Sequence, residues 1–398
     1  MPRVHGRRIL RRMDASAIDA LLERAVPGVV AITGDRDGVR YEGAFGLLSL
    51  EGDRPVLPDT MFWIASMTKA IVSVAALQLI EQGSLDLEQP VGAILPAFGE
   101  LQVLEGFDGD APRLRPPAGQ ATIRQLLTHT AGLGYWFANA DLLRYQQQAG
   151  IPDPFTGRRA MLEMPLVADP GTRWEYGTST DWLGQIVEAV SGQDLAAYCR
   201  QHIFGPLGMA DATFSPTDEQ RGRMMLLHSR RSDRDLVPTP IDLPAEPEMW
   251  SGGLGAFATA MDYLRFMRAL LRGGELDGER VLRGETVELA FTDHLQGAKL
   301  PAVVFSAIRE LSNDIPSLPV LQGWGLGVHL ALTDIPGMRR AGTGDWAGIA
   351  NCCFWIDRVA GVCGAFMTQV LPAYDARAAD TAIRFERAVY AELGARVG

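Results

Sequence analysis

Apolar positions near the start of the chain follow first a helical and then a strand-like period. From Asp14 onward they recur every three to four residues, which predicts a short helix ending before Pro27. Two β-rich runs follow at residues 29–33 and 39–45, separated by a segment rich in glycine and aspartate. This pattern predicts a β-hairpin directly after the first helix.

The longest helical pattern covers residues 66–82 and is apolar on nearly every side. Gly83 follows it, at the position where glycine commonly ends a helix. Because a helix without a polar face has no side to turn towards water, we expect this helix to lie buried at the centre of the protein.

The middle of the chain, approximately residues 85–319, changes to short helical patterns interrupted by proline and glycine. This change predicts a mostly helical lobe with long loops. Its clearest helical patterns cover residues 123–129, 182–190, 195–203 and 261–271.

The end of the chain mirrors its beginning. Residues 348–356 and 361–370 are two further β runs, and an amphipathic helical pattern covers residues 375–393. The simplest arrangement is an α+β fold, in which an antiparallel sheet is built from both termini, is flanked by the terminal helices and has the helical lobe inserted.

Neither internal repeats nor linkers divide the chain, so we predict a single unit over residues 1–398. Its α/β lobe would comprise approximately residues 14–84 and 320–398. Hydrophobic residues make up 47% of the chain and charged residues 21%, as in ordinary globular proteins, which excludes disordered, collagen-like and coiled-coil classes.

Net charge and targeting signals limit the partners. A net charge of -11 gives no electrostatic reason to bind nucleic acid or an anionic membrane, so we expect neither as a partner. No apolar run approaches the length of a transmembrane helix, and no export signal follows the arginines near the N-terminus. We therefore expect a cytoplasmic location unless a leader was removed, and the oligomeric state stays open.

Cysteine spacing argues against metal and disulfide sites. The four cysteines are too few and too irregularly spaced for a disulfide framework or a zinc site, so we expect no metal and no cofactor. The basic residues are more informative, since only Lys69 and Lys299 among 37 are lysine. Arginine cannot lose its proton in a protein whereas lysine can, so a retained lysine is a candidate for proton transfer.

Ser66 and Lys69 open the buried helix and lie one turn apart, so that the hydroxyl and the ammonium share one face. A serine hydroxyl is a poor nucleophile until a neighbouring base takes its proton, and a buried lysine can be that base. The helix N-terminus also offers backbone N–H groups to an oxyanion. Alternatively, the pair is a capping serine followed by an ordinary solvated lysine.

Further motifs favour the catalytic interpretation, because together they resemble the penicillin-recognising serine hydrolases. This family comprises β-lactamases, penicillin-binding proteins and the β-lactamase-like carboxylesterases of family VIII. The resemblance implies a β-lactamase/transpeptidase-like fold, close to that of class C β-lactamases. It rests on FWIASMTK at residues 62–69, LLTHTAGL at 126–133, PGTRWEY at 170–176, GGL at 252–254 and GWGLG at 323–327.

The resemblance also implies a second catalytic motif, Tyr-x-Asn, which falls on Tyr176-Gly177-Thr178. Tyr176 would share the Ser66 proton with Lys69 and return a proton to the leaving group. The family expects asparagine where this chain has Thr178, which we treat as a substrate-binding position with a weakened hold on an amide.

The family's third motif, Lys-Thr-Gly or His-x-Gly, is replaced by a segment similar to the Trp-Gly-Gly of the carboxylesterase branch. This similarity implies that Trp346 walls the substrate site, that Gly348 permits close approach of the strand, and that the backbone N–H groups of Ile349 and Ser66 form the oxyanion hole. Tyr135, just after the second resembling segment, either lines the pocket entrance or is simply packed.

These features predict a serine carboxylesterase that hydrolyses small-molecule esters through an acyl-enzyme on Ser66, with Lys69 and Tyr176 as the base pair. A β-lactamase or D-amino-acid amidase is the alternative among hydrolases. Acyl transfer to an alcohol would use the same residues and differ only in what resolves the acyl-enzyme.

Overall fold

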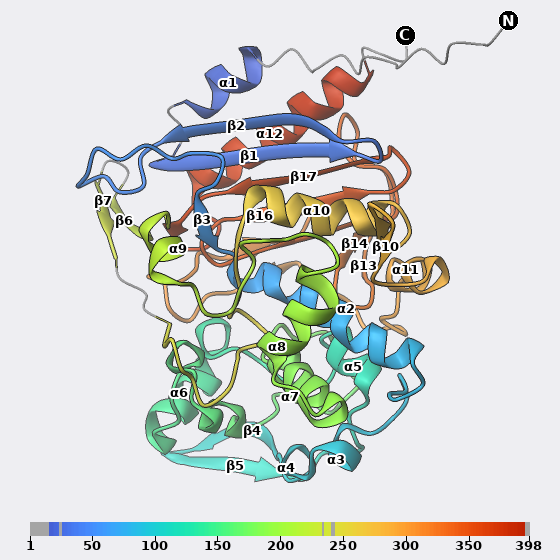
Figure 1. Ribbon diagram of the computed structural model, residues 1–398. Helices are drawn as coiled ribbons and strands as arrows, with labels where there is room; N and C mark the ends of the chain where they lie inside the picture. Colours follow the sequence, from blue (N-terminus) through green and yellow to red (C-terminus); the bar gives the residue numbers. More distant parts are fainter. Residues whose placement is uncertain (1–15, 24–25, 233–234, 240–242, 395–398) are drawn as a thin grey trace, which may run out of the picture.

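A seven-stranded antiparallel sheet joins the two ends of the chain (Figure 1). The computed structural model describes residues 16–23, 26–232, 235–239 and 243–394. β17 pairs with β1, so that Ala365 lies opposite Ile32, and this pairing confirms the sheet predicted from both termini. In spatial order the strands are β13 (Gln322–Trp324), β14 (His329–Ala331), β15 (Thr343–Ala347), β16 (Cys353–Asp357), β17 (Val362–Met367), β1 (Gly28–Asp35) and β2 (Val39–Gly46).

Helices cover both faces of this sheet. The terminal helices α1 (Ser16–Leu22) and α12 (Ala376–Gly394) lie together on one face, and α10 (Ala260–Leu271) lies on the other (Figure 1). α10 thus packs on the sheet although its residues fall within the range predicted for the helical lobe. The predicted start of the first helix at Asp14 lies outside the described residues.

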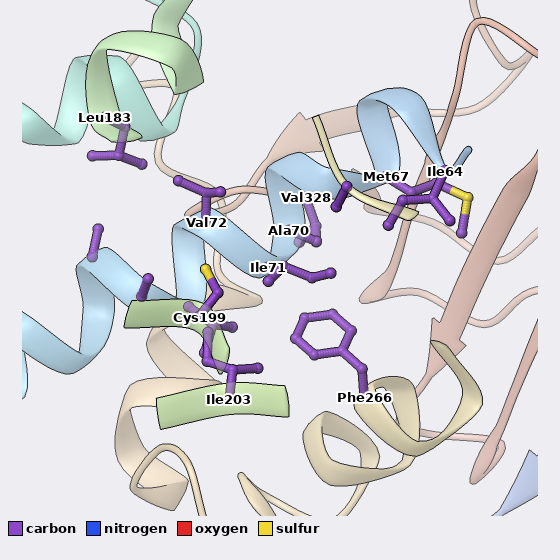
Figure 2. Close-up of a cluster of buried hydrophobic side chains, with 14 of the residues drawn as sticks. Ile64, Met67, Ala70, Ile71, Val72, Leu183, Cys199, Ile203, Phe266 and Val328 are labelled. Atoms are coloured by element: carbon purple, nitrogen blue, oxygen red, sulfur yellow. The ribbon is translucent and has the colours of Figure 1, made fainter. Parts of the chain in front are cut away.

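The predicted central helix is α2 (Thr68–Glu81), and every residue from Thr68 to Leu79 is buried. Side chains of α7 (Ser179–Ser191), α8 (Leu195–Cys199) and α10 surround it (Figure 2). Burial from several sides explains why α2 lacks a polar face, and it fixes the start of the helix rigidly within the protein.

The remaining elements are short and mostly belong to the segment between α2 and the late strands. They are β3 (Met61–Trp63), α3 (Val91–Ile94), α4 (Pro96–Gly99), β4 (Val103–Asp108), β5 (Ala111–Arg115), α5 (Ile123–Leu127), α6 (Ala140–Ala149), α9 (Asp218–Gly222), β6 (His228–Ser232), β7 (Asp235–Pro238), β8 (Phe257–Thr259), β9 (Glu275–Leu276), β10 (Glu279–Arg280), α11 (Gly284–Ala290), β11 (Val303–Val304), β12 (Ile315–Pro316) and β18 (Val370–Leu371).

Two predicted elements differ from the structure. The β run predicted at residues 348–356 begins with a turn, in which Gly348 N–H donates to Cys352 O at 2.8 Å, and β16 starts only at Cys353. The helix predicted at 195–203 changes after α8 into a turn of wider π-helix, Arg200–Phe204. Among the described residues, no helix combines the length and apolarity needed to cross a bilayer.

Candidate active site

Ser66 lies in a tight turn between β3 and α2, within the short 3-10 helix Ala65–Met67. Ala65 has a φ of 45°, in the left-handed region that residues with a Cβ rarely adopt. Packing holds this strained turn, and the Tyr263 hydroxyl donates a hydrogen bond to Met67 O at 2.9 Å. The turn leaves Ser66 9% exposed, so its hydroxyl sits at the edge of the core rather than in open solvent.

Lys69 points from the first turn of α2 at the Ser66 hydroxyl. Its Nζ lies 3.1 Å from Ser66 Oγ, 3.1 Å from the Tyr135 hydroxyl and 2.8 Å from Gly253 O. A lysine ammonium has three N–H donors, and three acceptors surround this one. Since Lys69 is 2% exposed, its ammonium is held in one position against the Ser66 hydroxyl.

Tyr176 approaches the same hydroxyl from the other side. Its phenol donates a hydrogen bond to Ser66 Oγ at 2.7 Å. Tyr135 N–H donates to Tyr176 O at 3.1 Å, and the centres of the two tyrosine rings lie 5.1 Å apart. Lys69 Nζ lies 4.9 Å from the centre of the Tyr176 ring, a distance at which cation and ring attract.

Trp346, near the end of β15, contacts Tyr176 directly. Its indole Nε1–H donates to the Tyr176 hydroxyl oxygen at 3.3 Å, and the two rings lie 5.1 Å apart. An indole N–H can only donate, so the Tyr176 oxygen is the acceptor in this contact. The sequence predicted Trp346 as a wall of the substrate site but gave no sign of this hydrogen bond.

The turn after β15 packs tightly against the turn that carries Ser66. A Cβ added at Gly348 would lie 2.7 Å from Ile64 O and 2.5 Å from Cys352 Sγ, so only glycine fits. Gly348 N–H is already bonded to Cys352 O. The next backbone N–H is that of Ile349, which stays the predicted partner of Ser66 N–H in an oxyanion hole.

Burial controls the charge states of three groups around Lys69. It raises the pKa of Tyr135 well above the usual value, and the charge of Asp181 raises it further. Burial and then the charge of Lys69 lower the pKa of His129 well below the usual range, which keeps its ring neutral. Burial also raises the pKa of Asp181, against the opposing effect of Lys69.

Two apolar clusters meet at Tyr176. One consists of buried Tyr135, Trp136 and Phe137 with the partly buried Ala138, Leu143, Phe155, Ile308, Leu311 and Ile349. The other consists of buried Trp174, Leu295 and Trp324 with the partly buried Ala298, Leu300, Val304 and Trp346. The apolar side chains of the two clusters therefore form surroundings beside Tyr176 that suit apolar substrate groups.

Most of the predicted site residues therefore gather around one hydroxyl, but their contacts differ from the expectation. Tyr135, expected at a pocket entrance or in simple packing, hydrogen-bonds Lys69 and is 3% exposed. Thr178 immediately precedes α7 and is also 3% exposed, so its predicted role towards substrate stays a prediction. Sequence analysis missed Asp181, whose only local signal was an acidic residue directly before the helical pattern predicted at 182–190.

Comparisons with known proteins show the family to which the chain is similar. A family model described as "Beta-lactamase" matches residues 10–388. Monacolin J acid methylbutanoyltransferase of Aspergillus terreus is 33% identical over 96% of this chain and 95% of that protein. Esterase EstB of Burkholderia gladioli is 31% identical over 96% and 95%. The solved structure of a LovD6 mutant of simvastatin synthase from Aspergillus terreus superposes with a TM-score of 0.82, at 30% identity, over 98% of this chain and 100% of that one.

Proposed function

The chain belongs to the beta-lactamase family and is a serine hydrolase or acyltransferase of that family, and from this premise we propose that it is a carboxylesterase acting on small esters. One observation carries the proposal. The Ser66 hydroxyl is hydrogen-bonded at once by Lys69 Nζ at 3.1 Å and by the Tyr176 phenol at 2.7 Å, so a nucleophile and two proton-transfer groups share one point.

In the proposed reaction Ser66 Oγ attacks the ester carbonyl and passes its proton to the Lys69 and Tyr176 pair. The backbone N–H groups of Ser66 and Ile349 receive the developing oxyanion. The pair then protonates the departing alcohol, and an acyl-enzyme remains on Ser66. Water attacks this acyl group in the second half of the reaction and releases the acid.

Two substitutions favour esters over β-lactams. Trp346 stands where a family lysine would meet a substrate carboxylate, and Thr178 stands where asparagine would hold an amide. The apolar clusters on both sides of Tyr176 supply no replacement charge. An ester with uncharged groups on both sides of its carbonyl needs neither a partner for a carboxylate nor a partner for an amide.

Acyl transfer to an alcohol is the second candidate. The identity of 33% to a protein named as a methylbutanoyltransferase favours it. Transfer and hydrolysis would share Ser66, Lys69 and Tyr176 and would differ in whether an alcohol or water resolves the acyl-enzyme. Addition of a primary alcohol during ester turnover separates them, because transfer yields a new ester detectable by mass spectrometry.

Covalent labelling of Ser66 tests the proposal. A fluorophosphonate should add one adduct to the wild-type protein, visible as one mass shift of the intact chain, and should add none to Ser66→Ala. The wild type should also hydrolyse short p-nitrophenyl esters, and Ser66→Ala should lose this activity. Labelling that persists in Ser66→Ala would show that another residue is the nucleophile.

A further inference from the structure

Asp181 is a buried carboxylate next to the proposed catalytic groups, and the reaction described above does not use it. It lies in the first turn of α7 and is 0% exposed. Its Oδ1 accepts hydrogen bonds from Ser251 Oγ and from Gly253 N–H, the latter at 3.0 Å. Its Oδ2 is buried and has no hydrogen-bond partner among the described residues.

Gly253 connects Asp181 to Lys69. While its N–H donates to Asp181, its carbonyl oxygen accepts from Lys69 Nζ at 2.8 Å. A Cβ added at Gly253 would lie 2.4 Å from Asp181 Oδ2 and 2.9 Å from the Tyr135 hydroxyl. The backbone at Gly253 is therefore clamped between the carboxylate and the phenol, and Asp181 fixes the direction of the carbonyl that holds Lys69.

Lys69 also needs a compensating charge. It is 2% exposed, and its three hydrogen-bond partners, two hydroxyls and a backbone carbonyl, carry no formal charge. A buried ammonium without a compensating charge is strongly destabilised, because it has lost its hydration. Asp181 is the carboxylate whose charge interacts with it, and this interaction opposes the effect of burial on Asp181.

The other titratable groups packed around Lys69 offer no such charge. His129 is neutral, as described above, and Tyr135 keeps its proton. The Tyr176 phenol donates a hydrogen bond to Ser66 Oγ and therefore carries its proton. Burial raises the pKa of three further groups beside the Ser66 turn and α2, namely Tyr263 on α10, Cys352 in the turn before β16 and Cys199 on α8, so these groups stay uncharged. Glu81, at the far end of α2, pairs with Arg283.

We propose that Asp181 is the positioning residue of Lys69, which both aims the Gly253 carbonyl at the ammonium and balances its charge. Asp181 does not touch Ser66 and takes no part in bond making. The inference rests on the proposed function, because it assigns a role towards the proton-transfer group of that site.

The variant Asp181→Asn separates the charge from the hydrogen bonds. Its amide oxygen can still accept from Ser251 and Gly253, but the negative charge is gone. Removing a nearby negative charge disfavours the protonated form of Lys69, so the titration midpoint of Lys69 should move to lower pH than in the wild type. A residue with only a packing role would leave this titration unchanged.

The lysine content makes the titration measurable. The chain has two lysines, so ¹³C-lysine labelling gives two side-chain NMR signals, and Lys299→Arg identifies that of Lys69. We expect the Lys69 midpoint to move to lower pH in Asp181→Asn. Asp262→Asn is the matched control, because Asp262 is a buried carboxylate of α10 that accepts from Asp211 N–H instead of from the site. An unmoved midpoint in folded Asp181→Asn, or an equal shift in Asp262→Asn, overturns the charge role.

Labelling kinetics provide the second readout. The pH dependence of fluorophosphonate labelling of Ser66 should shift in Asp181→Asn in the same direction as the Lys69 midpoint. If the wild type is not labelled at all, the proposed function fails and this inference falls with it. If the wild type is labelled but the profile of Asp181→Asn coincides with it, only the role of Asp181 is refuted.

Ser251→Ala tests the positioning role even if Asp181→Asn does not fold. It removes one donor to the carboxylate and retains the negative charge. We expect slower labelling of Ser66, by about tenfold, because the carbonyl of Gly253 is held less firmly. Labelling at the wild-type rate in this variant would refute the positioning role.

Discussion

Lys69 is one of only two lysines in the chain, and the pair gives a matched test of its chemistry. Arginine retains the positive charge but cannot give up its proton, so Lys69→Arg should lower kcat/KM for a p-nitrophenyl ester by about 10²- to 10⁴-fold. Lys299→Arg makes the same change at an exposed position and should keep wild-type activity. Thermal melting checks that both variants fold, and near-normal turnover in folded Lys69→Arg would contradict a proton-transfer role.

Local sequence identified some of these residues and could not identify others. The Ser66 and Lys69 pair is visible because its partners lie one helical turn apart. Tyr176 required a longer motif, since a single tyrosine is usually a packed aromatic. The contact of Lys69 with Gly253 joins positions 184 residues apart in sequence, and no local pattern of residue types encodes such a contact.

The turn after β15 is the element on which the proposed oxyanion hole depends. Gly348→Ala would place a Cβ 2.7 Å from Ile64 O and push the turn away from Ser66. We expect kcat/KM to fall by about 10²-fold, the typical effect of losing one oxyanion donor. Steady-state kinetics on a p-nitrophenyl ester measure the effect.

The control is Gly119→Ala, because a Cβ added at Gly119 meets no atom within 4 Å. This variant should match the wild type in activity and in melting temperature. If Gly348→Ala were as active as Gly119→Ala, the turn would not need its close approach to the nucleophile.

The same turn shows where element prediction from periodicity stops. An apolar run at residues 348–356 satisfies the criterion for a strand, but the chain turns at Gly348 so that the end of β15 and the start of β16 can pair. The nucleophile turn is similar, because residues 66–82 are helical in pattern whereas Ser66 lies in a separate 3-10 turn. Periodicity reports burial, and both segments are indeed largely buried, but it does not report backbone direction.

For the whole molecule, patterns at the two termini were sufficient to predict the α+β sheet, because long strands such as β1 and β17 alternate or run apolar over several residues. The edge strand β13 and its neighbour β14 have three residues each, too few for a period to be recognised. The sequence pattern also could not predict which charged side chains form ion pairs between elements. Arg339 contacts both Asp345 of β15 and Glu386 of α12, and thereby ties the last helix to the strand that carries Trp346.

Substrate selectivity depends on the whole site and provides the last test. A β-lactam brings a carboxylate and an amide that lose water on binding, and a buried polar group left unpaired costs about 1 to 3 kcal/mol. Trp346 and Thr178 replace the residues expected to pair with them, and the apolar clusters around Tyr176 add no charge. An ester makes neither demand, so kcat/KM for a short p-nitrophenyl ester should exceed that for nitrocefin by about 10²-fold or more. Ser66→Ala should abolish both activities, which confines the comparison to one site. Comparable values for the two substrates would show that other side chains pair with the β-lactam groups and that the esterase assignment is wrong.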